Sequence, residues 1–224
     1  MYTFSTLAAA LALFGAASAL PTNTGPANAN PTDGASCGGS QPPIEPVCVP
    51  GRAVAPELII LKDATPDDVV SEPSGNTLSL ALGFIGNQQD QIALFKDIPA
   101  TAKDCKFGWK QREANTQETF GTQGNALVEY RKVPANGGPY SYNAVKQLAS
   151  QDDSPSMIDF TSWDQPGFAA DEFHVGGNID CEEVIHMHLT VSKLNGETGG
   201  VTMEGVSTAP DDSELQGVFV EWSC

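Results

Sequence analysis

Two histidines separated by one residue are the first feature of this sequence that could do chemistry. On a β-strand the imidazoles of His186 and His188 would point to the same face, because side chains two residues apart share a face. Two imidazoles and a carboxylate can hold a transition metal. The sequence supplies a third imidazole at His174 and carboxylates at Glu182 and Glu183. The candidate metal ligands are therefore His186, His188 and His174.

Known metal sites of this type argue against the hypothesis. In cupins and the double-stranded β-helix oxygenases, a His-x-His strand works with a downstream Glu and a further His. Here the first Glu after His188 is Glu197, and no histidine follows. We therefore expect His186 and His188 to form part of a solvent-facing, polar strand surface, and we expect no cofactor.

Adjacent carboxylates are a second candidate for chemistry. A glycosidase needs two carboxyl groups that face each other across a cleft, about 5 to 9 Å apart, one of them with a raised pKa. Neighbouring residues on a strand point to opposite faces, so adjacency alone does not predict such a pair. A glycan-active or metal-dependent enzyme stays an alternative to the non-enzymatic protein that we favour. The adjacent acidic pairs lie at 67–68, 152–153, 171–172, 182–183 and 211–212.

Tryptophan side chains could bind a ligand by stacking on sugar rings. Trp109 and Trp222 lie in alternating apolar segments, so we expect them to pack in or near the core. Trp163 lies in a turn-like segment, residues 162–167, and is the candidate stacking residue.

The N-terminal residues have the pattern of an export signal. An uninterrupted run of apolar and small residues, 7–17, ends in Ala17-Ser18-Ala19, the small-x-small pattern that signal peptidase requires. The run is shorter than the ~20 residues of a membrane span and stops at Pro21. We expect a signal peptide at residues 1–19, a secreted product of the extracellular space or cell wall, and no membrane span.

Export changes the interpretation of the cysteines, because disulfides persist outside the cell. The spacing contains no Cys-x-x-Cys motif, and the number is odd, so one thiol stays free or pairs between chains. We favour a local Cys37–Cys48 loop and one bridge among the other three, with the connectivity open. The disulfide candidates are Cys37, Cys48, Cys105, Cys181 and Cys224.

The charge balance excludes one class of partner. The chain has 28 acidic and 11 basic residues and a net charge of −17. Such a field repels nucleic-acid phosphates and anionic lipid. The remaining partners that we consider are a cell-wall polysaccharide and a host protein.

Composition divides the rest of the chain into a linker and one domain. Residues 20–54 are rich in Pro, Gly, Ala, Asn and Thr, which predicts a flexible linker. Residues 55–224 consist of short alternating segments separated by turn residues, which predicts an all-β fold, an antiparallel, jelly-roll-like β-sandwich. Only residues 143–151 indicate a helical turn. The main strand candidates are 58–61, 77–84, 91–95, 105–109, 126–130, 140–142, 157–163, 173–175, 183–193, 201–205 and 218–222.

Several short motifs follow one another in the C-terminal region. They comprise a strand ending in Gly-Phe, an Ile-Pro-Ala turn, two cysteine-bearing strands and a last strand that ends in cysteine. In this order they resemble the C-terminal domain of many secreted fungal proteins, named after the ubiquitin 3 binding protein (the But-two family), over residues 56–224. The motifs are Leu82–Phe84, Asp97–Ala100, Asp104–Phe107, Cys181, His188–Val191, Gly200–Met203 and Gly217–Cys224.

The resemblance implies a small secreted β-sandwich with bridges among Cys105, Cys181 and Cys224. It implies no catalytic residues, since the family has no established active-site motif. The family name refers to an intracellular partner that an exported protein does not meet, so we do not transfer that activity. Residues and resemblance together predict a secreted, non-enzymatic fungal protein that binds a glycan or a protein.

Overall fold

The structure is a computed structural model, and it describes the greater part of the C-terminal region. The described residues are 48–55, 57–83, 87–111, 120–135, 138–149, 155–161, 163, 173–204 and 215–224. They belong to a compact unit, Glu45–Cys224. The expected signal peptide at 1–19, the expected linker up to residue 47 and Cys37 lie outside them.

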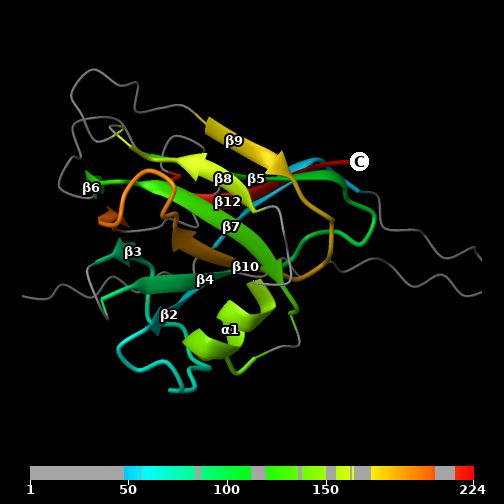
Figure 1. Cartoon of the computed structure of the whole chain (residues 1–224). Helices are drawn as coiled ribbons and strands as arrows, with labels where there is room; N and C mark the ends of the chain where they lie inside the picture. Colours follow the sequence, from blue (N-terminus) through cyan, green and yellow to red (C-terminus); the bar gives the residue numbers. More distant parts are fainter. Residues whose placement is uncertain are drawn as a thin grey trace, which may run out of the picture. The chain divides into compact units, whose positions relative to one another are not determined.

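Two antiparallel sheets make up the fold, as the alternating pattern predicts (Figure 1). The small sheet has four strands in the order β1 (Gly51–Val54), β12 (Gly217–Ser223), β5 (Lys103–Lys110) and β9 (Phe173–Asn178). The larger sheet has the order β6 (Phe120–Gly124), β11 (Gly199–Met203), β3 (Leu78–Leu82), β4 (Gln89–Phe95), β10 (Ile185–Val191), β7 (Leu127–Val133) and β8 (Ser156–Asp159), and β2 (Glu57–Lys62) pairs with β4. The all-β sandwich is confirmed.

The main core lies between the two sheets. Alternate residues of each strand contribute to it, as period-two patterning requires. The Phe95 ring of the larger sheet meets the Phe107 ring of the small sheet edge to face, with centroids 6.1 Å apart. Phe107 in turn lies 4.4 Å from the Tyr130 ring on the larger sheet. All three side chains are at most 2% exposed, so aromatic packing joins the sheets.

A second apolar cluster lies on the outer face of the larger sheet. The helix α1 (Tyr142–Ala149) covers this face with Tyr142 and Val145, which pack with Ile59 and Ile92 of the sheet. The helix begins after Ser141, whose hydroxyl accepts a hydrogen bond from the Ala144 N–H at 3.3 Å, a typical N-cap. The helical turn expected at 143–151 is confirmed as far as Ala149, and residues 150 and 151 lie outside the described residues.

Three local expectations differ from the structure. Gly51–Val54, assigned to the linker by composition, forms β1, because its backbone pairs with β12. In this pairing Arg52 lies opposite Glu221, 169 residues away in the sequence. Tyr140 and Tyr142 do not form a strand: Tyr140 makes an isolated bridge to Val70, and Tyr142 begins the helix. The Gly-rich segment β6 carries no apolar alternation, so the pattern missed it.

No helix in the described part of the chain is long and apolar enough to cross a membrane.

Candidate functional site

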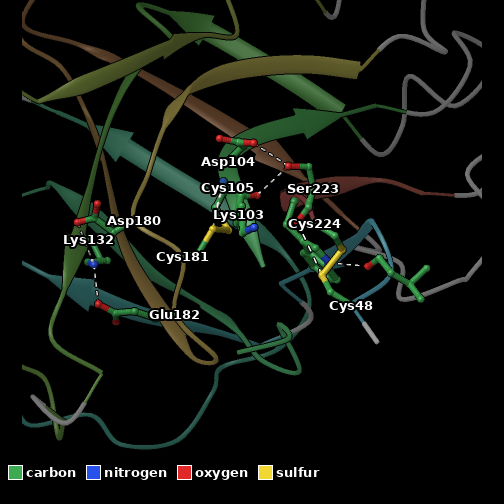
Figure 2. The surroundings of a disulfide bond; sticks show 12 residues. Cys48, Lys103, Asp104, Cys105, Lys132, Asp180, Cys181, Glu182, Ser223 and Cys224 are labelled. Atoms are coloured by element: carbon green, nitrogen blue, oxygen red, sulfur yellow. Dashed lines mark hydrogen bonds and ion pairs between the residues drawn. A yellow bond between two sulfur atoms is a disulfide. The ribbon is translucent and has the colours of Figure 1, made fainter. Parts of the chain in front are cut away.

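The described cysteines form two disulfides, Cys48–Cys224 and Cys105–Cys181 (Figure 2). The expected local Cys37–Cys48 loop is wrong, because Cys48 pairs with Cys224. The antiparallel pairing of β1 with β12 brings these distant residues together, since Gly51 lies opposite Trp222. The expected bridge among the other three cysteines is confirmed as Cys105–Cys181.

The two disulfides differ in their surroundings. Cys105 is fully buried on the inner face of β5, and its N–H donates to the Cys181 sulfur at 3.2 Å. Cys48 is half-buried and Cys224 is exposed. Beside them the Ser223 hydroxyl donates to Asp104 at 2.8 Å, as Figure 2 shows. One bridge therefore belongs to the core, and the other lies at the surface.

A groove is lined by residues of both sheets, among them Trp222, which lies two residues before Cys224 in the sequence. We call it the rim groove; its volume is about 350 Å³. One wall comes from β1 and Trp222 of β12, and the other from β2, β4 and the turn that follows β4. The lining residues are Arg52, Ala53, Val54, Glu57, Leu94, Lys96, Asp97 and Trp222.

The position of the Trp222 indole is set by β1 and by Val49, two residues before that strand. Its Nε1–H donates to the Val49 carbonyl at 2.9 Å. The ring also lies against Gly51, where an added Cβ would come within 2.8 Å of the indole Cζ2. A glycine opposite the tryptophan is therefore required for this close approach. The indole is half-buried, so part of the ring remains accessible beside the groove.

The groove is lined by positively and negatively charged side chains. Lys96 Nζ lies 2.7 Å from Glu57 Oε2, and both side chains stay substantially exposed, at 50% and 39%. Asp97 follows with a φ of 63°, in the left-handed region that is uncommon for non-glycine residues. Carboxylate acceptors and an ammonium donor thus lie next to an aromatic ring. This combination suits a ligand that has hydroxyl groups and apolar C–H faces.

The three histidines do not converge, so the metal hypothesis is wrong. His174 lies on β9 in the small sheet, where its ring stacks on Trp109 with centroids 4.1 Å apart. His186 and His188 lie on β10 in the larger sheet. Among the described residues, no three His, Cys, Asp or Glu side chains are arranged to hold a metal ion.

His186 and His188 do share the face opposite Met187, as the spacing predicts, but the expectation that this face meets solvent is wrong. Their exposed fractions are 9% and 4%. The cause is the segment around α1, which covers the outer face of the sheet. His186 Nδ1 lies 2.5 Å from the Tyr140 hydroxyl, and His188 Nε2 lies 3.0 Å from Asp90 Oδ2.

Burial shifts the pKa values of two side chains in this part of the structure. Burial lowers the pKa of His186, and the positive charge of Lys96 adds to the effect. Burial also raises the pKa of Tyr142 to about 12, with the negative charges of Asp90 and Asp63 as further causes. Neither Asp90 nor His188 lines the rim groove or two further grooves, one beside Tyr130 and one beside Leu82. The cluster packs the segment around α1 against the larger sheet.

Trp163 does not lie in the open. It is half-buried, and its ring packs edge-on against His174 at 4.1 Å and Trp109 at 5.9 Å. Trp222, which we expected to pack in or near the core, does pack against the main core, and it also lines the groove. Sequence reasoning missed this groove because its walls come from β1, β4 and β12, and no local signal reports their proximity.

Comparison with family models and with curated proteins finds no match for this chain.

Proposed function

We propose that this protein is a non-enzymatic, secreted fungal protein of the But-two type that binds a neutral carbohydrate chain in the rim groove. The observation that carries the proposal is the place of Trp222, half-exposed in a groove that also presents Glu57, Lys96 and Asp97. The C–H face of a sugar packs on an aromatic ring, and its hydroxyls pair with carboxylates and ammonium groups.

The charge of the chain favours a neutral ligand. A net charge of −17 repels polyanionic glycans at long range. Within the groove, Lys96 is already paired with Glu57 and does not provide an isolated positive site. A wall polysaccharide of neutral sugars therefore fits better than a uronic-acid polymer.

The extracellular setting rests on two supports. Both described disulfides are compatible with an oxidising compartment. The signal-like residues 1–19 and the order of motifs that resemble the But-two family point in the same direction.

Titration of the secreted, full-length protein with chitohexaose, laminarihexaose and cellohexaose tests the proposal. Calorimetry should show binding of at least one, accompanied by a change in tryptophan fluorescence. Trp222→Ala should weaken that binding at least tenfold, and Trp222→Phe should retain most of it, because the phenyl ring preserves the apolar face. Trp163→Ala serves as the matched control, and its affinity should be unchanged. The absence of binding to all three sugars, or equal affinities of Trp222→Ala and wild type, would refute the proposal.

The two carboxylates of the groove support glycan hydrolysis as a second candidate. Glu57 and Asp97 both line it, at the same end of the β2–β4 pair, where Glu57 lies opposite Leu94. Chromatography of the same sugars after long incubation distinguishes turnover from binding. Shorter products that disappear in both Glu57→Gln and Asp97→Asn would replace the binding proposal with an enzyme.

A further inference from the structure

We propose that the Cys48–Cys224 disulfide is a redox latch on the rim groove: its reduction releases β1 from β12 and removes one wall of the groove. This inference deepens the proposed function, because it concerns the regulation of the same site, and only its ligand-binding arm rests on that function.

The strand that the disulfide holds is short and peripheral. β1 has four residues, all half-buried, and among the described strands it pairs with β12 alone, at the edge of the small sheet. At its far end, the Ala55 N–H donates to the Val218 carbonyl at 3.2 Å. At its near end, the covalent link at Cys48 prevents fraying. Edge strands of this length have little local stability of their own.

The second disulfide is better protected. Cys105 is 0% exposed, and Cys181 packs against the main core. Backbone bonds also surround it, since the Ile179 N–H donates to the Cys105 carbonyl at 2.8 Å. An attacking thiolate must reach a sulfur atom in line with the bond. Cys224 is exposed, so a thiolate can approach its sulfur, and the Cys48–Cys224 disulfide is reduced first.

Release of β1 changes the groove directly. Arg52, Ala53 and Val54 of the strand line it, and Val49 and Gly51 fix the indole of Trp222. Without β1, the indole loses its hydrogen-bond acceptor and its packing surface. The groove then lacks both a wall and an ordered aromatic ring, and ligand affinity falls.

The chemistry is an ordinary thiol–disulfide exchange. One thiolate of a dithiol reductant attacks the Cys224 sulfur, and the Cys48 sulfur leaves as a thiolate and takes up a proton. The second thiol of the reductant then attacks the mixed disulfide and frees Cys224. The protein gains two electrons and two protons, and the reductant is oxidised to its own disulfide.

The first test follows the latch without a ligand. It uses the full chain with Cys37→Ser, so that the fifth cysteine cannot exchange with the bridges. The oxidised protein is treated with graded dithiothreitol, alkylated and mapped by peptide mass. Cys48 and Cys224 should be labelled at reductant concentrations that leave Cys105 and Cys181 intact. Hydrogen exchange should become at least tenfold faster at Gly51–Val54 and stay unchanged at Leu78–Leu82. Simultaneous reduction of both bridges, or unchanged exchange in β1, overturns the proposal.

The second test uses the sugar that binds the oxidised protein. Its affinity should fall at least tenfold after selective reduction and return after reoxidation. The variant Cys48→Ser/Cys224→Ser should behave like the reduced form; reduction of the folded wild type gives the same answer if that variant does not fold. Unchanged affinity in a protein whose β1 has opened contradicts the latch. If the oxidised protein binds none of the three sugars, the proposed function fails, and the thiol mapping and hydrogen exchange still decide whether β1 is released.

Discussion

His188 Nε2 lies 3.0 Å from Asp90 Oδ2, and both side chains are only 5% exposed. The second carboxylate oxygen of Asp90 accepts hydrogen bonds from Thr190 at 2.7 Å and from Gln88 at 3.1 Å. Asp90 belongs to β4, whereas His188 and Thr190 belong to β10, so these bonds cross the pair of strands at the centre of the larger sheet. They fix the register of that pair, because a slip by one residue would leave a carboxylate buried without partners.

Removal of the Asp90 carboxylate should be strongly destabilising. Asp90→Ala removes the partner of the buried His188 and the acceptor of the half-buried Thr190, while Gln88 keeps the Thr190 hydroxyl as an acceptor at 2.9 Å. We expect a loss of about 3 kcal/mol in the free energy of unfolding. Chemical denaturation measures it. Asp68→Ala, at an exposed position, is the control and should change stability by less than about 0.5 kcal/mol. Similar effects for the two variants would show that the buried carboxylate has no structural role.

The phenol of Tyr142 should ionise only at strongly alkaline pH. Its pKa is raised from 10.0 to about 12, so the unfolded chain releases this proton before the folded protein does. Stability should therefore fall as pH rises from about 10 to about 12, by on the order of 2–3 kcal/mol. Ultraviolet difference spectroscopy at high pH follows the phenolate. Asp90→Asn removes one cause of the shift and should lower the pKa of Tyr142; an unchanged titration would exclude the influence of Asp90.

Burial of neutral His186 should make the protein sensitive to acid. Its pKa is lowered in the folded state, so below about pH 6.5 the unfolded chain binds a proton that the folded protein does not. Stability should fall as pH drops below that value and level off once the folded protein is protonated too. His186→Phe removes the titratable imidazole. Tyr140 keeps its hydrogen bond to the Pro134 carbonyl at 3.1 Å. Denaturation curves from pH 7 to pH 5 should be flatter for the variant; equal slopes would contradict the prediction.

Two glycines of the β6–β11 pair should respond very differently to alanine. A Cβ at Gly199 would lie 1.8 Å from the Asn125 carbonyl oxygen, whereas one at Gly121 would have no atom within 4 Å. Gly199→Ala forces the backbone of β11 away from Asn125 and should cost at least about 3 kcal/mol. Gly121→Ala should be tolerated with a change of less than about 1 kcal/mol. Thermal unfolding of the two variants provides the comparison, and equal melting temperatures would refute it.

Local alternation was enough to predict the sandwich and the orientation of its longest strand. Ile185, Met187 and Leu189 lie in the main core, which places His186 and His188 on the outer face as expected. Whether that outer face meets solvent depends on the segment around α1. The pattern of β10 contains no information about a helix that begins more than 40 residues earlier, at Tyr142.

The pairing of Cys48 could not be predicted for a similar reason. Sequence proximity favours Cys37, because short loops close at a lower entropic cost. In the folded protein the hydrogen bonds between β1 and β12 bring Cys48 to Cys224, and the bridge follows the sheet. The rim groove has the same origin: Gly51 and Trp222 face each other across this pair. Nothing in the sequence around either residue predicts that it lies opposite the other.

The central position of β12 in the small sheet has a consequence for biosynthesis. β12 pairs with β1 on one side and with β5 on the other. β1 and β5 are therefore joined only through β12, and they belong to one sheet only once β12 has formed. A nascent chain cannot complete this sheet before residue 223 has been made, nor close the outer disulfide before residue 224. Partners so far apart in sequence also slow folding. The domain should therefore reach its native state only after residue 224 has been made, and until then the small sheet has open edges.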